Sequence, residues 1–216
     1  MIEVTLLCSN KSHPIYEHLE GWCLNNKNKI SANLINQVDS IEAGGDILFL
    51  VSCTEIVPKS IRKMFRYSLV LHASDLPNGR GWSPHIWDII SGKDKLTVSL
   101  LNAEDSVDTG DIWKQKHIKL NGLELYDEIN SMVFEAELNL ISWACKNIDI
   151  NEPKKQSSIG ASYHRKREPS DSKIDINKSI LEQFNLLRAC DPFRYPAFFE
   201  LNGQKFKLLL ERYDEE

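Results

Sequence analysis

One histidine and one aspartate have the residue types and surroundings needed for acid–base chemistry. His72 ends the apolar run 68–71, which predicts a buried strand, and open parallel sheets bind ligands at the carboxyl ends of their strands. Asp108 lies in a second polar segment, 103–111, and a nearby carboxylate can orient a histidine ring and fix its tautomer. Such a pair supports general acid–base catalysis. On the residues alone, a structural histidine is equally compatible with the pattern.

The loop after His72 is built for sharp turns and close ligand approach. Pro77, Gly79 and Gly81 favour such backbone conformations. Ser83 is then expected to cap a helix in which Pro84 is the first residue.

The elements that must position these residues alternate between strands and helices. Apolar runs predict strands at 2–8, 31–35, 47–51, 68–72, 96–101 and 112–120, and helical periodicity predicts helices at 14–24, 58–65, 83–91 and 123–145. This alternation predicts βαβ units and therefore an α/β, Rossmann-like, mostly parallel sheet.

The composition changes at a polar stretch, 147–158, which we interpret as a linker. The predicted organisation is a core at 1–146, this linker, and a C-terminal accessory region at 159–216. The accessory region is expected to hold a helix at 178–190 and a β-hairpin within 197–210, turning at Asn202 and Gly203.

Charge and cysteine content narrow the class of protein. The net charge is −5 and the one dense basic stretch is 164–167, which weighs against a nucleic-acid partner. No apolar run reaches the ~20 residues that span a bilayer, and the N-terminus does not resemble a secretion signal. Five cysteines without paired spacing favour neither disulfides nor a metal site. We expect a cytoplasmic protein with no membrane partner and no metal.

Three segments carry a family resemblance. Residues 72–84, HASDLPNGRGWSP, resemble the H-x-S-x-L-P-x-x-x-G segment of the folate-dependent formyltransferases. DTGDI at 108–112 resembles the second signature of the methionyl-tRNA and sugar branches, and 48–61 resembles the stretch whose loop lies beside the pterin ring. The resemblance covers roughly residues 45–145 and implies the formyltransferase core fold. By contrast, no G-x-G-x-x-G follows the first strand, as a dinucleotide-binding site would require.

This resemblance implies a cofactor and roles for particular residues. The cofactor would be N10-formyltetrahydrofolate. His72 would stabilise the developing oxyanion and move protons, and Asp108 would orient His72. The pterin would lie between two loops, one contributing Ser52, Cys53 and Ile56 and the other Glu104, Asp105, Ser106 and Val107.

One position departs from the family pattern. Val70 stands where the family usually has an asparagine that helps to bind the formyl oxygen. Removing one such donor costs ~10²–10³ in rate. The Ser74 hydroxyl or a backbone amide is the expected substitute.

The C-terminal region points to a substrate. Residues 162–172, 185–192 and 195–198 resemble segments of bacterial sugar formyltransferases, which implies a UDP- or dTDP-linked 4-amino-4,6-dideoxy sugar as substrate. The candidate substrate-binding residues are Arg80, Gly81, Trp82, Tyr163, Arg165 and Arg167. For each arginine, a solvated loop charge is an equal alternative. The expected hairpin aromatics suit either a homodimer contact or simple packing.

Two other functions stay open. A methionyl-tRNA formyltransferase is expected to carry a basic C-terminal barrel, whereas only 58 residues, 159–216, follow the linker. A homologue that binds folate or a nucleotide sugar without catalysis is the other alternative, and Val70 is the feature that favours it.

Overall fold

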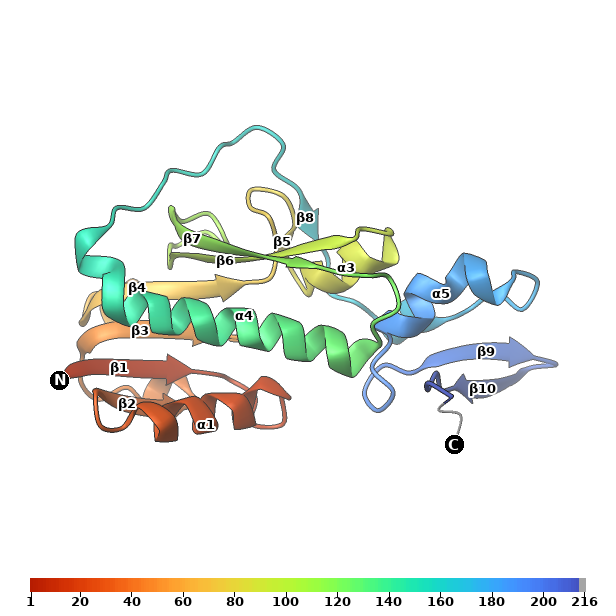
Figure 1. Cartoon of the computed structure of the whole chain (residues 1–216), viewed down its shortest axis with the longest axis horizontal. Helices are drawn as coiled ribbons and strands as arrows, with labels where there is room; N and C mark the ends of the chain where they lie inside the picture. The colour runs from red at the N-terminus through yellow and green to blue at the C-terminus, as the bar shows by residue number, and fades with distance from the viewer. Residues whose placement is uncertain (214–216) are drawn as a thin grey trace.

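The computed structural model describes residues 1–213 and is organised around a six-stranded sheet (Figure 1). The strand order is β2-β1-β3-β4-β6-β7. The strands are β1 (Ile2–Leu7), β2 (Ile30–Ile35), β3 (Gly45–Val51), β4 (Phe65–His72), β6 (Lys95–Asn102) and β7 (Ile112–Lys119). The mostly parallel α/β sheet predicted from the sequence is therefore confirmed.

The parallel and antiparallel parts of the sheet meet at β4. Strands β2, β1, β3 and β4 pair in parallel, whereas β6 is antiparallel to both β4 and β7. The connection 103–111 between β6 and β7 is too short for the crossover that a parallel pair requires. His72, the last residue of β4, lies opposite Ser99 at this junction.

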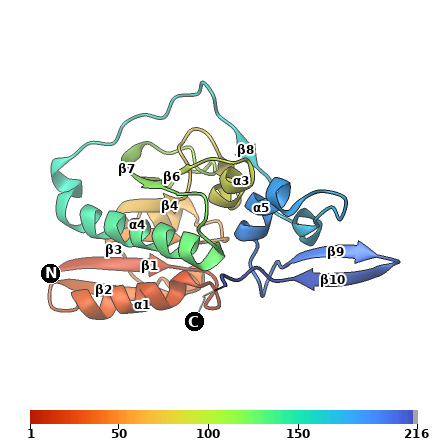
Figure 2. The same ribbon diagram turned by 45° about the vertical axis from the view of Figure 1, so that its right-hand side comes forward.

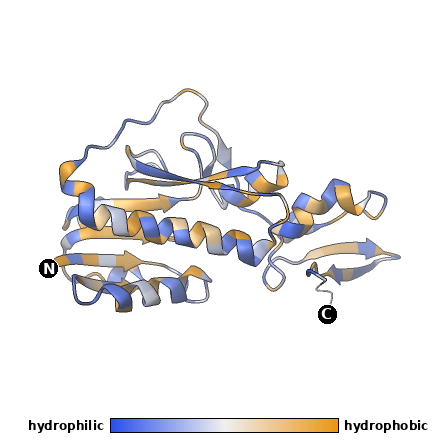
Figure 3. Cartoon of the chain, in the orientation of Figure 1, coloured by the Kyte–Doolittle hydropathy of each residue, from blue (hydrophilic) through white to orange (hydrophobic). Residues whose placement is uncertain are grey.

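Helices cover one face of the sheet. They are α1 (Ile15–Asn26), α3 (Pro84–Ile90) and α4 (Tyr126–Asn147), and their buried side chains pack on Leu6, Phe49, Leu69 and Leu71. The indole of Trp22 donates a 2.8 Å hydrogen bond to Ser142, which links α1 to α4. Figure 3 shows that β3 and β4 are mostly hydrophobic, whereas α4 alternates between apolar and polar bands. Such alternation is expected of a helix with one buried face.

The other face of the sheet is covered by shorter segments. Leu48, Leu50 and Phe65 pack there against η1 (Val38–Ser40) and the loop around Val57. The helix expected at 58–65 is wrong in length, because α2 spans only Lys59–Arg62. The reason is that Phe65 is buried and pairs with Gly45, so sheet pairing ends the helix early.

The C-terminal region begins with a long segment that arches over the sheet, as Figures 1 and 2 show. It leads from η2 (Ile148–Ile150) to β8 (Tyr163–His164), which pairs in parallel with β5 (Arg80–Gly81). Next come η3 (Pro169–Ser172), α5 (Ile180–Ala189), β9 (Ala197–Leu201) and β10 (Gln204–Leu208). The predicted helix and hairpin are confirmed, and both turn residues, Asn202 and Gly203, have positive φ.

Buried polar contacts fasten this region to the core. Arg188 in α5 is 2% exposed and donates to the backbone carbonyl of Glu124, whose carboxylate lies 3.6 Å away. The Tyr126 hydroxyl donates a 2.9 Å hydrogen bond to Asp191. In the projecting hairpin, Phe199 and Phe206 stack on each other at 5.3 Å, so these aromatics pack together within one chain. A homodimer contact stays a prediction.

Within residues 1–213, no helix combines the length and apolar character needed to cross a membrane.

Candidate active site

His72 is buried at the carboxyl end of β4, with an oxygen acceptor near each ring nitrogen. It is 7% exposed, and its Nε2 lies 2.8 Å from the carbonyl oxygen of Gly79. Its Nδ1 lies 3.5 Å from a carboxylate oxygen of Asp108. A proton on either nitrogen therefore has an acceptor within reach.

Asp108 comes from a different loop and is held in an uncommon conformation. Its φ is +56°, a left-handed value that side-chain-bearing residues adopt rarely. One carboxylate oxygen faces His72, and the other accepts a 2.8 Å hydrogen bond from the backbone N–H of Gly81. The structure thus brings together the two residues that the sequence singled out, and a backbone amide orients the carboxylate.

Gly81 has to be glycine for two reasons. Its φ is +94°, and a Cβ at this position would lie 2.4 Å from the backbone oxygen of His164 and 2.8 Å from the Tyr163 ring. Only a residue without a side chain lets β8 approach β5 this closely. Gly81, which was predicted to contact substrate, therefore connects parts of the site: its N–H binds Asp108, and it lies in β5, where it pairs with His164 of β8.

Ser74 and Val70 bear on the expected oxyanion site. The Ser74 hydroxyl is buried without a protein partner, and the Ser74 Cβ lies so close to Gly79 that a Cβ on Gly79 would be 3.1 Å from it. Val70 precedes His72 by two residues in β4, so both side chains are on the same face of the sheet. Val70 packs there against the apolar cluster of Leu48 and Leu50 and offers no hydrogen bond.

The two loops expected beside the pterin carry exposed apolar tips. Ile56 is 87% exposed on the first loop, and Val107 is 60% exposed on the second. Ser52 has a positive φ of +46°. Cys53 is half-buried, and burial raises the pKa of its thiol, which stays protonated at neutral pH. Glu104, Asp105 and Ser106 are exposed beside Val107.

Arg62 ties these two loops together. Its guanidinium donates to the backbone carbonyls of Val57 and Ala103 and forms an ion pair with Asp105. The sequence analysis did not single out Arg62. A basic residue next to a predicted loop was the only available signal, since the pairing joins positions 43 residues apart.

The predicted substrate-binding side chains lie on β5, β8 and the following turn, and several of them are already engaged. Arg80 donates to Gln156, and Arg165 forms a bidentate pair with Asp171 at 2.5 and 2.7 Å. Arg167 donates to the Asp171 carbonyl and to Ser172. Trp82 lies under the Lys166 ammonium, and Tyr163 is 62% exposed.

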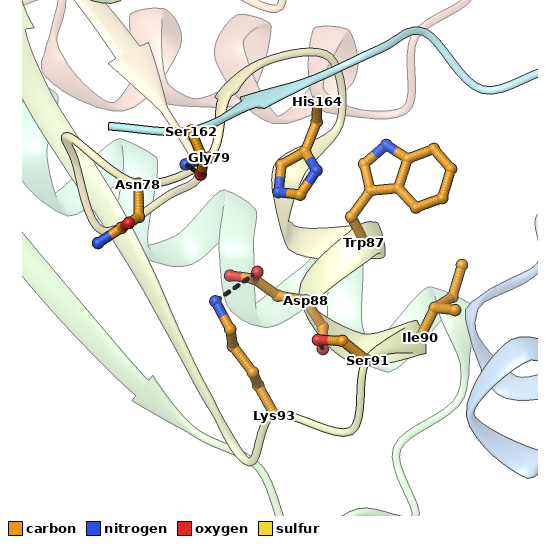
Figure 4. Close-up of a pocket in the computed structure, with 9 residues that line it drawn as sticks. All are labelled: Asn78, Gly79, Trp87, Asp88, Ile90, Ser91, Lys93, Ser162 and His164. Atoms are coloured by element: carbon orange, nitrogen blue, oxygen red, sulfur yellow. Dashed lines mark hydrogen bonds and ion pairs between the residues drawn. The ribbon is translucent and has the colours of Figure 1, made fainter. Parts of the chain in front are cut away.

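A pocket of about 370 Å³ adjoins the histidine–aspartate pair through Gly79 (Figure 4). The stacked rings of Trp87 and His164 bound one side, and the Asp88–Lys93 ion pair bounds another. Neither His72 nor Asp108 lines this pocket.

The start of α3 differs from the expectation in one respect. Pro84 is the first helical residue, as predicted, but Ser83 has a φ of +45° and its side chain makes no capping hydrogen bond. His85, which follows Pro84, has a buried Nδ1 without a partner. Burial lowers the pKa of His85 to about 4, so this ring is neutral at pH 7. Across residues 1–213, no three His, Cys, Asp or Glu side chains converge as metal ligands.

The fold and the site together define a class of protein. It is an open α/β protein with a buried histidine–aspartate pair where the central strands end, the position at which such sheets bind ligands. The chain belongs to the formyl transferase family, whose model matches residues 3–144.

The curated relatives include methionyl-tRNA formyltransferases. The methionyl-tRNA formyltransferase of Rickettsia typhi is 32% identical over 188 residues, which cover 87% of this chain and 60% of that protein. The chain thus spans about 60% of the length of this relative.

Solved structures share the fold. A methionyl-tRNA formyltransferase from Clostridium thermocellum has a TM-score of 0.82 at 21% identity, covering 99% of this chain and 94% of that one. HypX from Aquifex aeolicus, in complex with tetrahydrofolic acid, has a TM-score of 0.78 at 18% identity, covering 97% of this chain and 37% of that one. A sugar N-formyltransferase from a Shewanella species has a TM-score of 0.74 at 17% identity and covers 100% of both chains.

Proposed function

We propose that this protein transfers a formyl group from N10-formyltetrahydrofolate to the amine of a nucleotide-linked 4-amino-4,6-dideoxy sugar. The observation that carries the proposal is the buried contact of His72 with Asp108, whose carboxylate is oriented by Gly81. Membership of the formyl transferase family supplies the reaction class.

The cofactor fits the two loops that Arg62 joins. Their exposed apolar tips, Ile56 and Val107, are surfaces that a flat heteroaromatic ring could cover. HypX, which shares the fold, binds tetrahydrofolic acid. Ser52, Cys53 and Ile56 would hold one side of the ring, and Glu104, Asp105, Ser106 and Val107 the other. The bound cofactor supplies an electrophilic formyl carbon.

The residues of the pair would divide the proton chemistry. When the substrate amine attacks the formyl carbon, negative charge develops on the formyl oxygen and the amine must lose a proton. His72, held by Asp108 at Nδ1, would donate its Nε2 proton to that oxygen in exchange for the Gly79 carbonyl, because preorganised donors contribute most where charge develops. Asp108 would hold the ring, accept the amine proton through water, and return that proton to N10 of the departing tetrahydrofolate as the formyl–N10 bond breaks. The unpartnered hydroxyl of Ser74 is the nearest candidate for the donor that Val70 lacks.

The C-terminal region supports a sugar nucleotide as substrate. β8 pairs with the loop after His72, so residues 163–164 lie beside the site. The pocket that Gly79 helps to line also contains the stacked rings of Trp87 and His164, which suit a nucleobase. Arg80 takes part in no ion pair of the described residues, which leaves its charge for a diphosphate, whereas Arg165 would have to exchange Asp171 for phosphate.

Methionyl-tRNA formylation is the second candidate, because the Rickettsia relative has that name and 32% identity. The salt dependence of substrate binding distinguishes the two candidates. A tRNA complex should weaken steeply as salt rises, because binding phosphates releases counterions. A sugar nucleotide presents only two phosphates and should respond weakly.

The test incubates the protein with N10-formyltetrahydrofolate and a panel of UDP- and dTDP-linked 4-amino-4,6-dideoxy sugars, with methionyl-tRNA in a parallel reaction. Mass spectrometry detects the added formyl group. Formylation of one sugar and not of the tRNA supports the proposal. Formylation of the tRNA alone moves the protein to the second candidate. Tetrahydrofolate binding without any product supports a non-catalytic binder.

A further inference from the structure

The segment expected to be a linker reaches into the candidate active site. Lys154 and Ile112 exchange two backbone hydrogen bonds, of 2.7 and 2.8 Å, which dock the segment on the start of β7. Two residues further on, the half-buried side chain of Gln156 lies between the Asp108 loop and β5. The segment is therefore part of the site's wall.

All the contacts of the Gln156 amide serve that loop and β5. Its Nε2 donates to the backbone carbonyls of Asp108, at 3.0 Å, and Gly110, at 2.7 Å. Its Oε1 accepts a 2.9 Å hydrogen bond from Arg80. Two donors and one acceptor are thus used in a geometry that only an amide side chain provides.

These contacts hold Asp108 in a left-handed backbone conformation, which a residue with a side chain adopts rarely. A positive φ is unfavourable for a side-chain-bearing residue and persists only where surrounding contacts impose it. At Asp108 those contacts act at both ends: Gly81 binds the carboxylate, and Gln156 binds the backbone carbonyl. Without Gln156, the backbone of Asp108 could rotate and turn its carboxylate away from His72.

We propose that Gln156 is a positioning residue that holds Asp108 in its left-handed conformation and thereby keeps the carboxylate against His72. Its role in turnover rests on the proposed formyl transfer, whereas its effect on the His72–Asp108 contact does not. Arg80, on the acceptor side, orients the amide so that both of its donors face the loop.

The test compares Gln156→Met, which keeps the length but removes the hydrogen bonds, with Lys155→Met at the exposed neighbouring position. Two-dimensional NMR of the labelled histidine rings, without cofactor or substrate, reports the tautomer and hydrogen bonding of His72, with Asp108→Asn as the reference for a lost contact. Gln156→Met should move the His72 signals toward those of Asp108→Asn, and Lys155→Met should leave them in place. Unchanged His72 signals in Gln156→Met overturn the proposal.

Kinetics provide the second readout. A misplacement of a catalytic group by about 1 Å can cost ~10²-fold in rate, so Gln156→Met should lower kcat by about 10- to 100-fold. The KM for the cofactor should change little, and the melting temperature should be near that of Lys155→Met. Equal kcat in the two variants overturns the positioning role. If the wild type formylates no substrate, the proposed function fails, and the NMR comparison still decides whether Gln156 holds Asp108.

Discussion

A buried carboxyl group in α4 makes the stability of this protein depend on pH. Glu137 is 5% exposed, and its Oε2 has no hydrogen-bond partner. Burial raises its pKa from 4.5 to about 8, because the charged form loses its hydration. At pH 7 the folded protein therefore keeps this group protonated, whereas the unfolded chain ionises it.

The sign and size of the effect follow from proton linkage. Below about pH 4.5 both states are protonated, and the group costs the folded state nothing. Between this value and about pH 8 the folded state holds the extra proton, so the free energy of unfolding falls as pH rises and then levels off. At 1.4 kcal/mol per pKa unit, the loss is about 3 kcal/mol at pH 7.

Glu137→Gln removes this titration while keeping the side-chain shape. Urea unfolding at pH 5 and pH 8 should show that the stability of the variant relative to wild type increases by about 3 kcal/mol over this range. Glu135→Gln, at an exposed position of the same helix, should show no such trend. The same Glu137→Gln difference at both pH values would refute the raised pKa of the buried carboxyl group.

Three further substitutions test other contacts. Arg62→Met should weaken tetrahydrofolate binding by about tenfold in calorimetry, because one hydrogen-bonding clamp of about 1–2 kcal/mol is lost, whereas the exposed Arg66→Met should not. Gly81→Ala should lower both activity and thermal stability, and Gly122→Ala, which has a similar φ of +90° but open space around it, should lower stability less and leave activity unchanged. Arg188→Met should cost about 2 kcal/mol in urea unfolding, because the Glu124 carboxylate loses its guanidinium partner and keeps only the backbone N–H groups of Asn121 and Gly122; no measurable loss contradicts the buried ion pair.

The sequence was most informative where chemistry and backbone geometry coincide. A histidine after an apolar run predicted the end of β4. The glycine-rich loop was predicted to make sharp turns and a close ligand approach, and Gly81 has the positive φ of such a turn and lies close to the backbone of β8. The Asn202–Gly203 pair predicted the hairpin turn, because few other residues accept positive φ at both positions.

The sequence was least informative about contacts between distant segments. Arg62 and Gln156 act through backbone carbonyls 41 to 48 positions away, and carbonyls have no residue type that a sequence pattern could reveal. The length of α2 was also set at a distance, because pairing of Phe65 with Gly45 in the sheet ended it. The polar composition of 147–158 suggested a linker and gave no sign that Lys154 and Gln156 dock on the core.

The most direct test of the account is the rate of formyl transfer by His72→Asn and Asp108→Asn, measured beside their affinity for tetrahydrofolate. General acid–base groups contribute ~10²–10⁴ in rate, so both variants should lose at least 100-fold in kcat while still binding tetrahydrofolate within about threefold of wild type. A His72→Asn variant that transfers formyl at close to the wild-type rate would contradict the assignment of this pair as the catalytic centre.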